Sequence, residues 1–421
     1  DTICYFDDWQ FNKDIVPNVS QNWRAGGEPM TYRKIDDHTI EFHFAVPNPA
    51  FFALTKSSPP IPPWIPAHHA RKFHKTHNPN AEAEAKAAGF DTWQAWFIKM
   101  AHAKQSYYGA QPPEVPVLEP WRPAKADSEG QYYERNPYYF KVDTEGNQLP
   151  YIDYVDVRYT SSMDVINMRA VSGELSALTR DLLLMNYPIL RENQEKGDYT
   201  LRLGSCARGA EISLAFNQNH PDPILGEIFR DLRFRQAISV AIDRNEINEL
   251  LFLGQGVPRQ ATVHDSCCFW QQRWADHYIQ FDLDLANQLL DEVGMSERNA
   301  DGVRLRSDGQ PLAFLLEYSQ TQAPFVEAAE LLVKQLDKVG IRVEAREEQK
   351  AFKAQRIDAD EHDCNMWFVD RTLERAHWSI AGGKLRPGDN GVCTGWQQWM
   401  NSGGETGVEP PDIVKKAYAA F

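Results

Sequence analysis

The sequence predicts an α/β protein of two or three domains. The main evidence lies in residues 312–345, where a strand pattern over Leu312–Glu317 precedes a helical pattern over Phe325–Val339 that stops at Gly340, and a second strand pattern begins at Ile341. Strand, helix and strand within about 35 residues predict a βαβ unit with parallel pairing. At about 150 residues per domain, a chain of 421 residues is long enough for two or three buried cores.

The first 115 residues predict a small α+β unit. Apolar and polar residues alternate over Thr39–Phe44, which indicates a half-buried strand. Ala81–Ala88 is rich in Ala and Glu and should form a helix that ends at Gly89. We expect Asp91 to cap a second, aromatic-rich helix. The proline-spaced connector at 112–116 marks a domain boundary near residue 115.

Strands precede a helix in the next segment, residues 116–211. Aromatic strands should flank the Asn136-Pro137 turn, and a second turn is expected at Thr144–Asn147. Tyr154–Tyr159 alternates as a strand, and a helix from Asp164 to Val171 should end shortly afterwards at a glycine.

The clearest helical periodicity begins at Asp231. Asp243–Asn245 interrupts it, and a second helix should run over Glu246–Leu253 and end at Gly254. A last helix is expected at Ile413–Phe421. The spacing of i, i+3, i+4, i+7 and i+8 places one face of the first helix in a core; this face carries Phe234, Ala237, Ile238, Ala241 and Ile242.

Composition narrows the class of protein. Against 44 Lys and Arg stand 59 Asp and Glu, a formal net charge of −15, which disfavours a general nucleic-acid binder. No window approaches the roughly 18 consecutive apolar residues that a membrane-spanning helix needs. Six cysteines are too few for a disulfide scaffold, and one bridge among Cys206, Cys364 and Cys393 is left open.

Four histidines crowd one stretch, His68, His69, His74 and His77, within a segment expected to be partly helical. A zinc site needs three or four converging ligands, and this run contains no Asp or Glu. The prediction is therefore a solvated, partly basic surface, with no metal and no cofactor.

Catalytic signatures are missing as well. The chain contains no G-x-S-x-G, no S-x-x-K and no recognisable catalytic Cys pattern. Phosphate-binding glycine motifs are also absent. We therefore predict a protein that is not an enzyme.

Tryptophan gives the strongest composition signal. Of the twelve Trp residues, four gather late in the chain, at Trp367, Trp378, Trp396 and Trp399. Flat indole faces that line a cleft can stack on sugar rings or peptide planes, but the same residues can also simply fill a core. Trp367 and Asp370 form a W-x-x-D, which could offer one stacking wall and one charge to a cationic group.

A long motif carries a family resemblance. Phe229-Arg-Asp-Leu-Arg-Phe-Arg-Gln-Ala-Ile-Ser-Val-Ala-Ile-Asp-Arg244, followed by Gly254, resembles the family 5 solute-binding proteins of ABC transporters, which include oligopeptide and dipeptide binders. Leu214–Asn217 resembles the family strand that ends in Asn just upstream. Supporting matches extend the resemblance over roughly residues 30 to 370, namely 134–139, 172–175, 286–294 and 301–304.

The resemblance implies a two-lobe periplasmic-binding-protein clamshell of type II, similar to cluster C, with an additional small α+β domain. Residues 1–115 would be the small inserted domain, and 116–211 would be part of lobe I, continued by 371–421. Residues 212–370 would form lobe II. The chain is similar to a family member that lacks the first segment of lobe I and its end.

The resemblance also implies a site. In peptide binders the W-x-x-D places its carboxylate against the α-amino group of the ligand, and Trp367 and Asp370 match that spacing. Two segments depart from the family pattern, 371–378 and 116–121. Because some family members bind oligosaccharides, sugars stay open as ligands, with Trp378, Trp396 and Trp399 as further candidate contacts.

The expected function is that of a substrate-binding component of an ABC importer. It would bind an oligopeptide between two lobes and deliver it to membrane permease subunits; an oligosaccharide is the first alternative. We expect a monomer outside the cytoplasm, periplasmic or extracellular, with membrane anchoring left open. The rival from another class is a peptide or glycan hydrolase, which would need a nucleophile or a carboxylate pair that no motif supplies.

Overall fold

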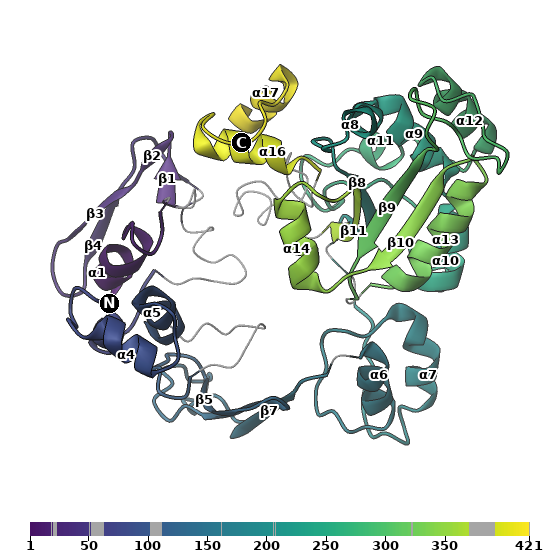
Figure 1. Cartoon of the computed structure of the whole chain (residues 1–421). Coiled ribbons are helices and arrows are strands. Elements are labelled where there is room, and N and C mark those ends of the chain that lie inside the picture. The colour runs from purple at the N-terminus through teal and green to yellow at the C-terminus, as the bar shows by residue number, and fades with distance from the viewer. Residues whose placement is uncertain are drawn as a thin grey trace. The chain divides into compact units, whose positions relative to one another are not determined.

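The computed structural model describes residues 1–17, 19, 23–49, 51, 63–101, 112–160, 162–204, 206, 208–320, 323–369 and 392–420. Its described residues form two compact units (Figure 1), one ending at Thr160 and one beginning at Ser162. This division falls between the boundaries proposed at residues 115 and 211.

The first unit begins with short helices and two-stranded ribbons around an aromatic core. Phe6, Trp23 and Trp93 are buried among further rings, because the predicted aromatic-rich helix turns its apolar face inward. Its elements are α1 (Thr2–Tyr5), η1 (Phe6–Gln10), β1 (Arg24–Ala25), β2 (Glu28–Pro29), β3 (Thr31–Lys34), β4 (Ile40–His43), α3 (Ala67–Ala70), η3 (Arg71–Phe73), α4 (Ala81–Ala87) and α5 (Trp93–Ala101).

An antiparallel meander completes the first unit. It consists of β5 (Trp121–Ala126), β6 (Gly130–Arg135) and β7 (Tyr154–Arg158), each paired with the next strand in the chain. The predicted strands at Thr39–Phe44 and Tyr154–Tyr159 are confirmed. The Asn136-Pro137 turn follows β6 as predicted, but the expected strand after it was wrong, because residues 138–141 form turn and irregular backbone.

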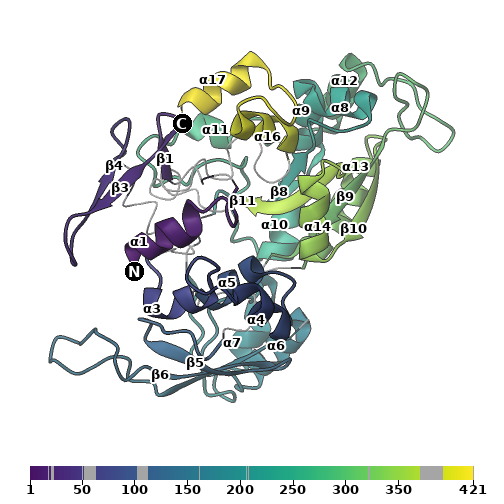
Figure 2. The ribbon, with the colours of Figure 1, turned by 60° about the vertical axis from the view of Figure 1, so that its left-hand side comes forward.

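The second unit contains the α/β layer. Figure 2 shows its sheet from a second side. Its elements are α6 (Met163–Val171), η4 (Leu184–Asn186), α7 (Tyr187–Glu192), β8 (Ala210–Phe216), α8 (Pro223–Arg230), α9 (Leu232–Ala241), α10 (Arg244–Phe252), α11 (Gln272–Ala275), α12 (Leu283–Glu292), β9 (Ala313–Tyr318), α13 (Phe325–Asp337), β10 (Arg342–Glu347), α14 (Lys350–Asp358), β11 (Cys364–Val369), α16 (Thr394–Ser402) and α17 (Asp412–Ala420).

The sheet of the second unit has the order β10-β9-β11-β8. The predicted βαβ unit is confirmed, since β9 and β10 pair in parallel, as do β9 and β11, whereas β8 is antiparallel to β11. Through α13 the chain passes from β9 to β10, and through α14 it returns from β10 across β9 to β11. Because these crossovers run in opposite directions, right-handed connections place α13 and α14 on opposite faces of the sheet. Figure 1 shows them on either side of the sheet.

The motif helix packs as its periodicity predicts. In α9, Phe234, Ala237 and Ile238 are buried in the core of the second unit. Asp231 caps α9, and Asp243 caps α10 by accepting the N–H groups of Asn245 and Glu246. Both caps satisfy amide donors that a helix start leaves without partners.

Two predictions at the residue level were wrong. Thr92, and not Asp91, accepts a helix-start amide of α5, through its Oγ1 and the Ala95 N–H. The histidine stretch is not a solvated surface throughout, because His69 and His74 are buried.

Two further expectations concerned a disulfide bridge and membrane-spanning helices. Neither Cys206 nor Cys364 forms a disulfide in the structure, so no bridge joins any pair among Cys206, Cys364 and Cys393. In the part of the chain that the structure describes, no helix has the length and apolar character to cross a membrane.

Candidate functional site

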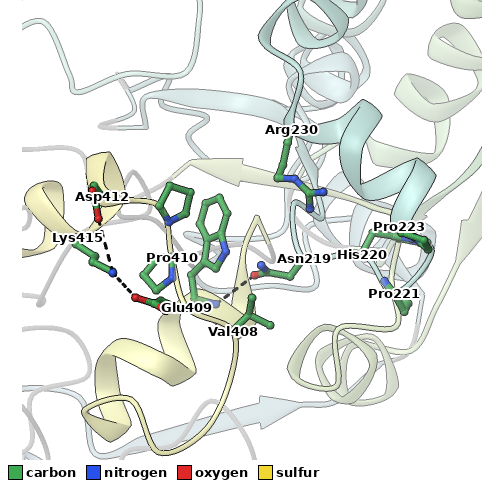
Figure 3. Close-up of a pocket in the computed structure, with 12 residues that line it drawn as sticks. Asn219, His220, Pro221, Pro223, Arg230, Val408, Glu409, Pro410, Asp412 and Lys415 are labelled. Carbon is green, nitrogen blue, oxygen red and sulfur yellow. Dashed lines mark hydrogen bonds and ion pairs between the residues drawn. The ribbon is translucent and has the colours of Figure 1, made fainter.

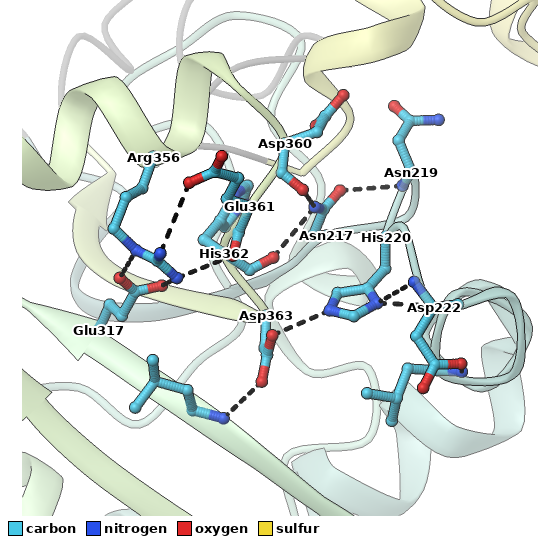
Figure 4. A network of polar contacts seen from close by, with 12 residues as sticks. Asn217, Asn219, His220, Asp222, Glu317, Arg356, Asp360, Glu361, His362 and Asp363 are labelled. Atoms are coloured by element: carbon cyan, nitrogen blue, oxygen red, sulfur yellow. Dashed lines mark hydrogen bonds and ion pairs between the residues drawn. The ribbon is translucent and has the colours of Figure 1, made fainter.

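The polar centre of the second unit lies where β8 ends, at Asn217. This fully buried side chain donates through Nδ2 to the carbonyls of Asp360 and His362, at 3.1 and 3.0 Å (Figure 4). Its Oδ1 accepts the Asn219 N–H at 2.9 Å. The asparagine that ends the family-like strand therefore ties this strand to the turn before β11.

His220 and Asp363 join the same two segments. Nδ1 of His220 accepts the Asp222 N–H, so the ring proton lies on Nε2 and is donated to Asp363 Oδ1 at 2.9 Å. The other carboxylate oxygen accepts the Leu315 N–H at 2.8 Å. Burial raises the pKa of Asp363, but these hydrogen bonds outweigh it and keep the pKa below its usual value.

The pKa of Asp360 is shifted in the opposite direction to that of Asp363. Its Oδ1 is buried without a hydrogen-bond partner, and burial raises the pKa of Asp360 to about 6, against the lowering effect of the Gly395 N–H. An ionised carboxylate at this position is therefore poorly compensated.

A cavity of about 620 Å³ adjoins this network (Figure 3). Its apolar wall comes from Trp396, Val408 and four prolines, whereas Arg230 and Lys415 bring positive charge and Glu409 and Asp412 negative charge. Lys415 is also paired with Glu409 at 2.5 Å and with Asp412 at 3.7 Å. The cavity therefore combines an apolar wall with charged groups of both signs.

Trp367 lies on β11, one residue before the buried Phe368. Its ring stacks on Phe368 with centroids 4.8 Å apart, and Lys353 Nζ lies 4.2 Å from the ring centroid. Phe325 of α13 approaches the same ring at 5.8 Å. Trp367 thus packs against protein groups from both helices that flank the sheet.

Trp396 and Trp399 share helix α16. The backbone N–H of Trp396 donates to Asn219 Oδ1 at 3.2 Å, and its buried ring lines the cavity described above. The ring of Trp399 has Lys415 Nζ 5.1 Å from its centroid. Trp399 therefore contacts Lys415, and Trp396 lines the same cavity as Lys415.

Two of the predicted site residues, Asp370 and Trp378, lie outside the described residues. Asn219, His220 and Arg230 line the cavity and were not predicted. For Asn219 and His220 the signal was present in the polar run that directly follows β8, Asn217-Gln-Asn-His-Pro-Asp222. Arg230 lies at the end of α8, within the family-like motif.

The family-like motif itself has a structural basis. Arg244, its last residue, donates through Nη1 to the Ser239 carbonyl at 2.7 Å and through Nη2 to the Ser239 hydroxyl at 2.8 Å. Burial lowers the pKa of Arg244 to about 10. This part of the motif therefore specifies the junction between α9 and α10, whereas Arg230 near its start lines the cavity.

Comparison with known proteins shows to which family the chain is similar. The family model described as bacterial extracellular solute-binding proteins, family 5 Middle, matches residues 7–373. A structure of an oligopeptide-binding protein OppA is 30% identical, with a TM-score of 0.59, and the match covers 100% of this chain and 68% of that one. The periplasmic binding protein MelB of Agrobacterium fabrum C58, in complex with stachyose, is 23% identical with a TM-score of 0.64, and covers 87% of this chain and 54% of its own.

The curated relatives are longer than this chain. A periplasmic alpha-galactoside-binding protein of Rhizobium meliloti is 26% identical over 100% of this chain, which spans 60% of that protein. A probable ABC transporter-binding protein of Deinococcus radiodurans is 23% identical over 80% of this chain and 54% of its own length.

The structural matches confirm the predicted fold, a mixed α/β architecture of the periplasmic-binding-protein type. Since the family model spans most of the sequence, including the motif of α9, the polar junction after β8 and strand β11, this chain belongs to the family 5 bacterial extracellular solute-binding proteins.

Proposed function

We propose that the chain is the solute-binding component of an ABC importer and that its solute is an oligopeptide. The protein acts outside the cytoplasm as a monomer, holds its ligand between two lobes and presents it to membrane permease subunits. Ligand binding favours the closed form because contacts with both lobes exist only there. It carries out no chemical reaction on the ligand.

The observation that supports this proposal most is the family match over residues 7–373, together with 30% identity to an oligopeptide-binding protein over the whole chain. The W-x-x-D provides the chemical argument for a peptide. A carboxylate at Asp370 would pair with the α-amino group of the ligand, which a sugar lacks.

The first experiment identifies the ligand and tests Asp370. Mass spectrometry of small molecules released from the purified protein should detect peptides. In calorimetric titration with a pool of tripeptides to pentapeptides, Asp370→Ala should weaken binding at least about tenfold, because the α-amino group of the peptide loses its charge partner.

Asp358→Ala is the matched control, since it removes an exposed carboxylate at the end of α14 and should leave peptide affinity unchanged. Equal affinity of wild type and Asp370→Ala for every peptide would overturn the assigned role of Asp370. Every ligand should be recovered intact after prolonged incubation; cleavage products would instead support the hydrolase that the sequence analysis kept as a rival.

An oligosaccharide is the second candidate solute. It is favoured by the alpha-galactoside-binding relative, which matches 100% of this chain, and by the fold shared with the stachyose complex. Titration with stachyose separates the two candidates. Binding of stachyose that survives Asp370→Ala, with no measurable peptide binding, would replace the oligopeptide by an oligosaccharide.

A further inference from the structure

We propose that Asp8, His74 and His77 form a binding site for a divalent transition-metal ion, with Zn²⁺ as the best-suited ion. The site lies in the first unit, apart from the cavity of the second unit. It joins η1, which carries Asp8, to the segment that follows η3, which carries both histidines.

The three side chains already converge. One ligand atom from each residue lies within 4.8 Å of the others, and His77 Nε2 is 2.9 Å from Asp8 Oδ1. In a tetrahedral zinc site, ligand atoms about 2.1 Å from the metal lie about 3.4 Å from one another. The ligand atoms would therefore have to move closer together when the ion binds.

Asp8 shows an independent sign of a missing partner. It is only 7% exposed, and its Oδ2 is buried without a hydrogen bond. The Cys4 thiol donates a hydrogen bond to the same carboxylate, and Arg71 Nε lies 3.6 Å from Oδ2 on a side chain that is half exposed. A buried carboxylate with such weak donors is costly, and a metal ion would compensate it directly.

The donor set selects the class of ion. Two imidazoles and one carboxylate are typical of zinc and related first-row metals, whereas Ca²⁺ and Mg²⁺ prefer oxygen ligands alone. His74 is 1% exposed and the His77 side chain 31% exposed, so the ion would have an open side for a water ligand and a path of entry.

Binding requires some present contacts to break. His74 Nδ1 accepts the Thr76 N–H at 3.2 Å, and Nε2 faces the Asn12 amide at 3.0 Å, so whichever ring nitrogen binds the ion gives up one contact. Arg71 must also turn away from Asp8. These changes reduce the affinity, and we expect dissociation constants in the micromolar range.

The ion would connect segments that are far apart in sequence. Asp8 and His77 are separated by 69 positions. Because a metal that binds only the folded chain stabilises it by mass action, Zn²⁺ should raise the melting temperature of the first unit.

The test measures Zn²⁺ binding to metal-free full-length protein by competition with a chromogenic chelator. Wild type should bind one ion that His77→Gln binds at least about tenfold more weakly. His68→Gln is the matched control, because it removes an exposed histidine from the same stretch and should bind like wild type. In thermal unfolding, Zn²⁺ should raise the melting temperature of wild type and of His68→Gln but not that of His77→Gln.

Circular dichroism of the metal-free proteins shows whether His77→Gln is folded. Asp8→Asn keeps the shape of the carboxylate without its charge and serves as the second variant. The proposal is overturned if His77→Gln and Asp8→Asn both bind Zn²⁺ as wild type does, or if wild type binds no ion at the expected concentration.

Discussion

Asp360 is a residue whose charge lowers the stability of the fold. Its backbone is left-handed, with φ of 57°, and its carboxylate is buried with one oxygen lacking a hydrogen bond. Asp and Asn adopt this backbone conformation more readily than most residues do. The backbone therefore suits the residue, whereas the charge does not.

This setting predicts a pH-dependent substitution effect. The folded-state pKa of Asp360 is about 6, above its usual value of 3.8, so the folded state holds the proton more tightly. The contribution of Asp360 is thus most favourable below pH 3.8 and is lost as the pH rises to about 6. Asp360→Asn should raise the free energy of unfolding at pH 7.5 by roughly 1–2 kcal/mol, after discounting for solvent screening, as measured by urea denaturation.

The effect of Asp360→Asn should vanish near pH 4, where the wild-type carboxyl group is largely protonated. Asp358→Asn is the control, since this side chain is exposed two positions earlier. A destabilised Asp360→Asn at pH 7.5 would mean that the ionised carboxylate is compensated better than its surroundings suggest.

The surroundings of Trp367 could not be predicted from the spacing of residues in the sequence. The sequence predicted a stacking wall for a ligand from the W-x-x-D alone. In the structure Phe368 and Lys353 contact the ring. Lys353 lies on α14, the helix of the crossover that precedes β11. The spacing of residues around Trp367 therefore does not predict this contact.

At the scale of elements, the α9–α10 junction depends on the buried guanidinium of Arg244. Its fork reaches both the carbonyl and the hydroxyl of Ser239. The ammonium of Lys cannot reproduce the planar fork that donates to both groups at once. Arg244→Lys should lower the free energy of unfolding by about 1–3 kcal/mol in urea denaturation.

Arg346→Lys is the matched control for Arg244→Lys. Arg346 pairs with Glu344 on exposed positions of β10, where an ion pair contributes less than about 1 kcal/mol. If both variants lose the same stability, the geometry of the Arg244 fork is not what stabilises the junction.

Local patterns predicted the elements better than their pairing. α13 and β10 lie where periodicity placed them, because apolar spacing and the stop at Gly340 act within a few residues. The antiparallel pairing of β8 with β11 was not predicted. It joins Phe216 to Cys364, and no local signal specifies a partner so distant in sequence.

At the scale of the whole molecule, too, local sequence patterns do not reveal which distant segments come together. A contiguous motif sufficed to predict the family. In contrast, the candidate metal site was not predicted, because Asp8 stands far from the histidine stretch in the sequence. Sites assembled from distant segments require the fold before their residues can be recognised.

The two units have separate hydrophobic cores, and this separation predicts how the whole molecule unfolds. The described core residues of the first unit lie between Cys4 and Ala101, and those of the second between Phe216 and Phe368. Phe97→Ala and Phe234→Ala each remove a fully buried ring and should each cost about 3–5 kcal/mol. Differential scanning calorimetry should resolve two transitions, of which Phe97→Ala lowers one and Phe234→Ala the other. If each variant lowers both transitions equally, the two cores unfold cooperatively and the chain is a single thermodynamic unit.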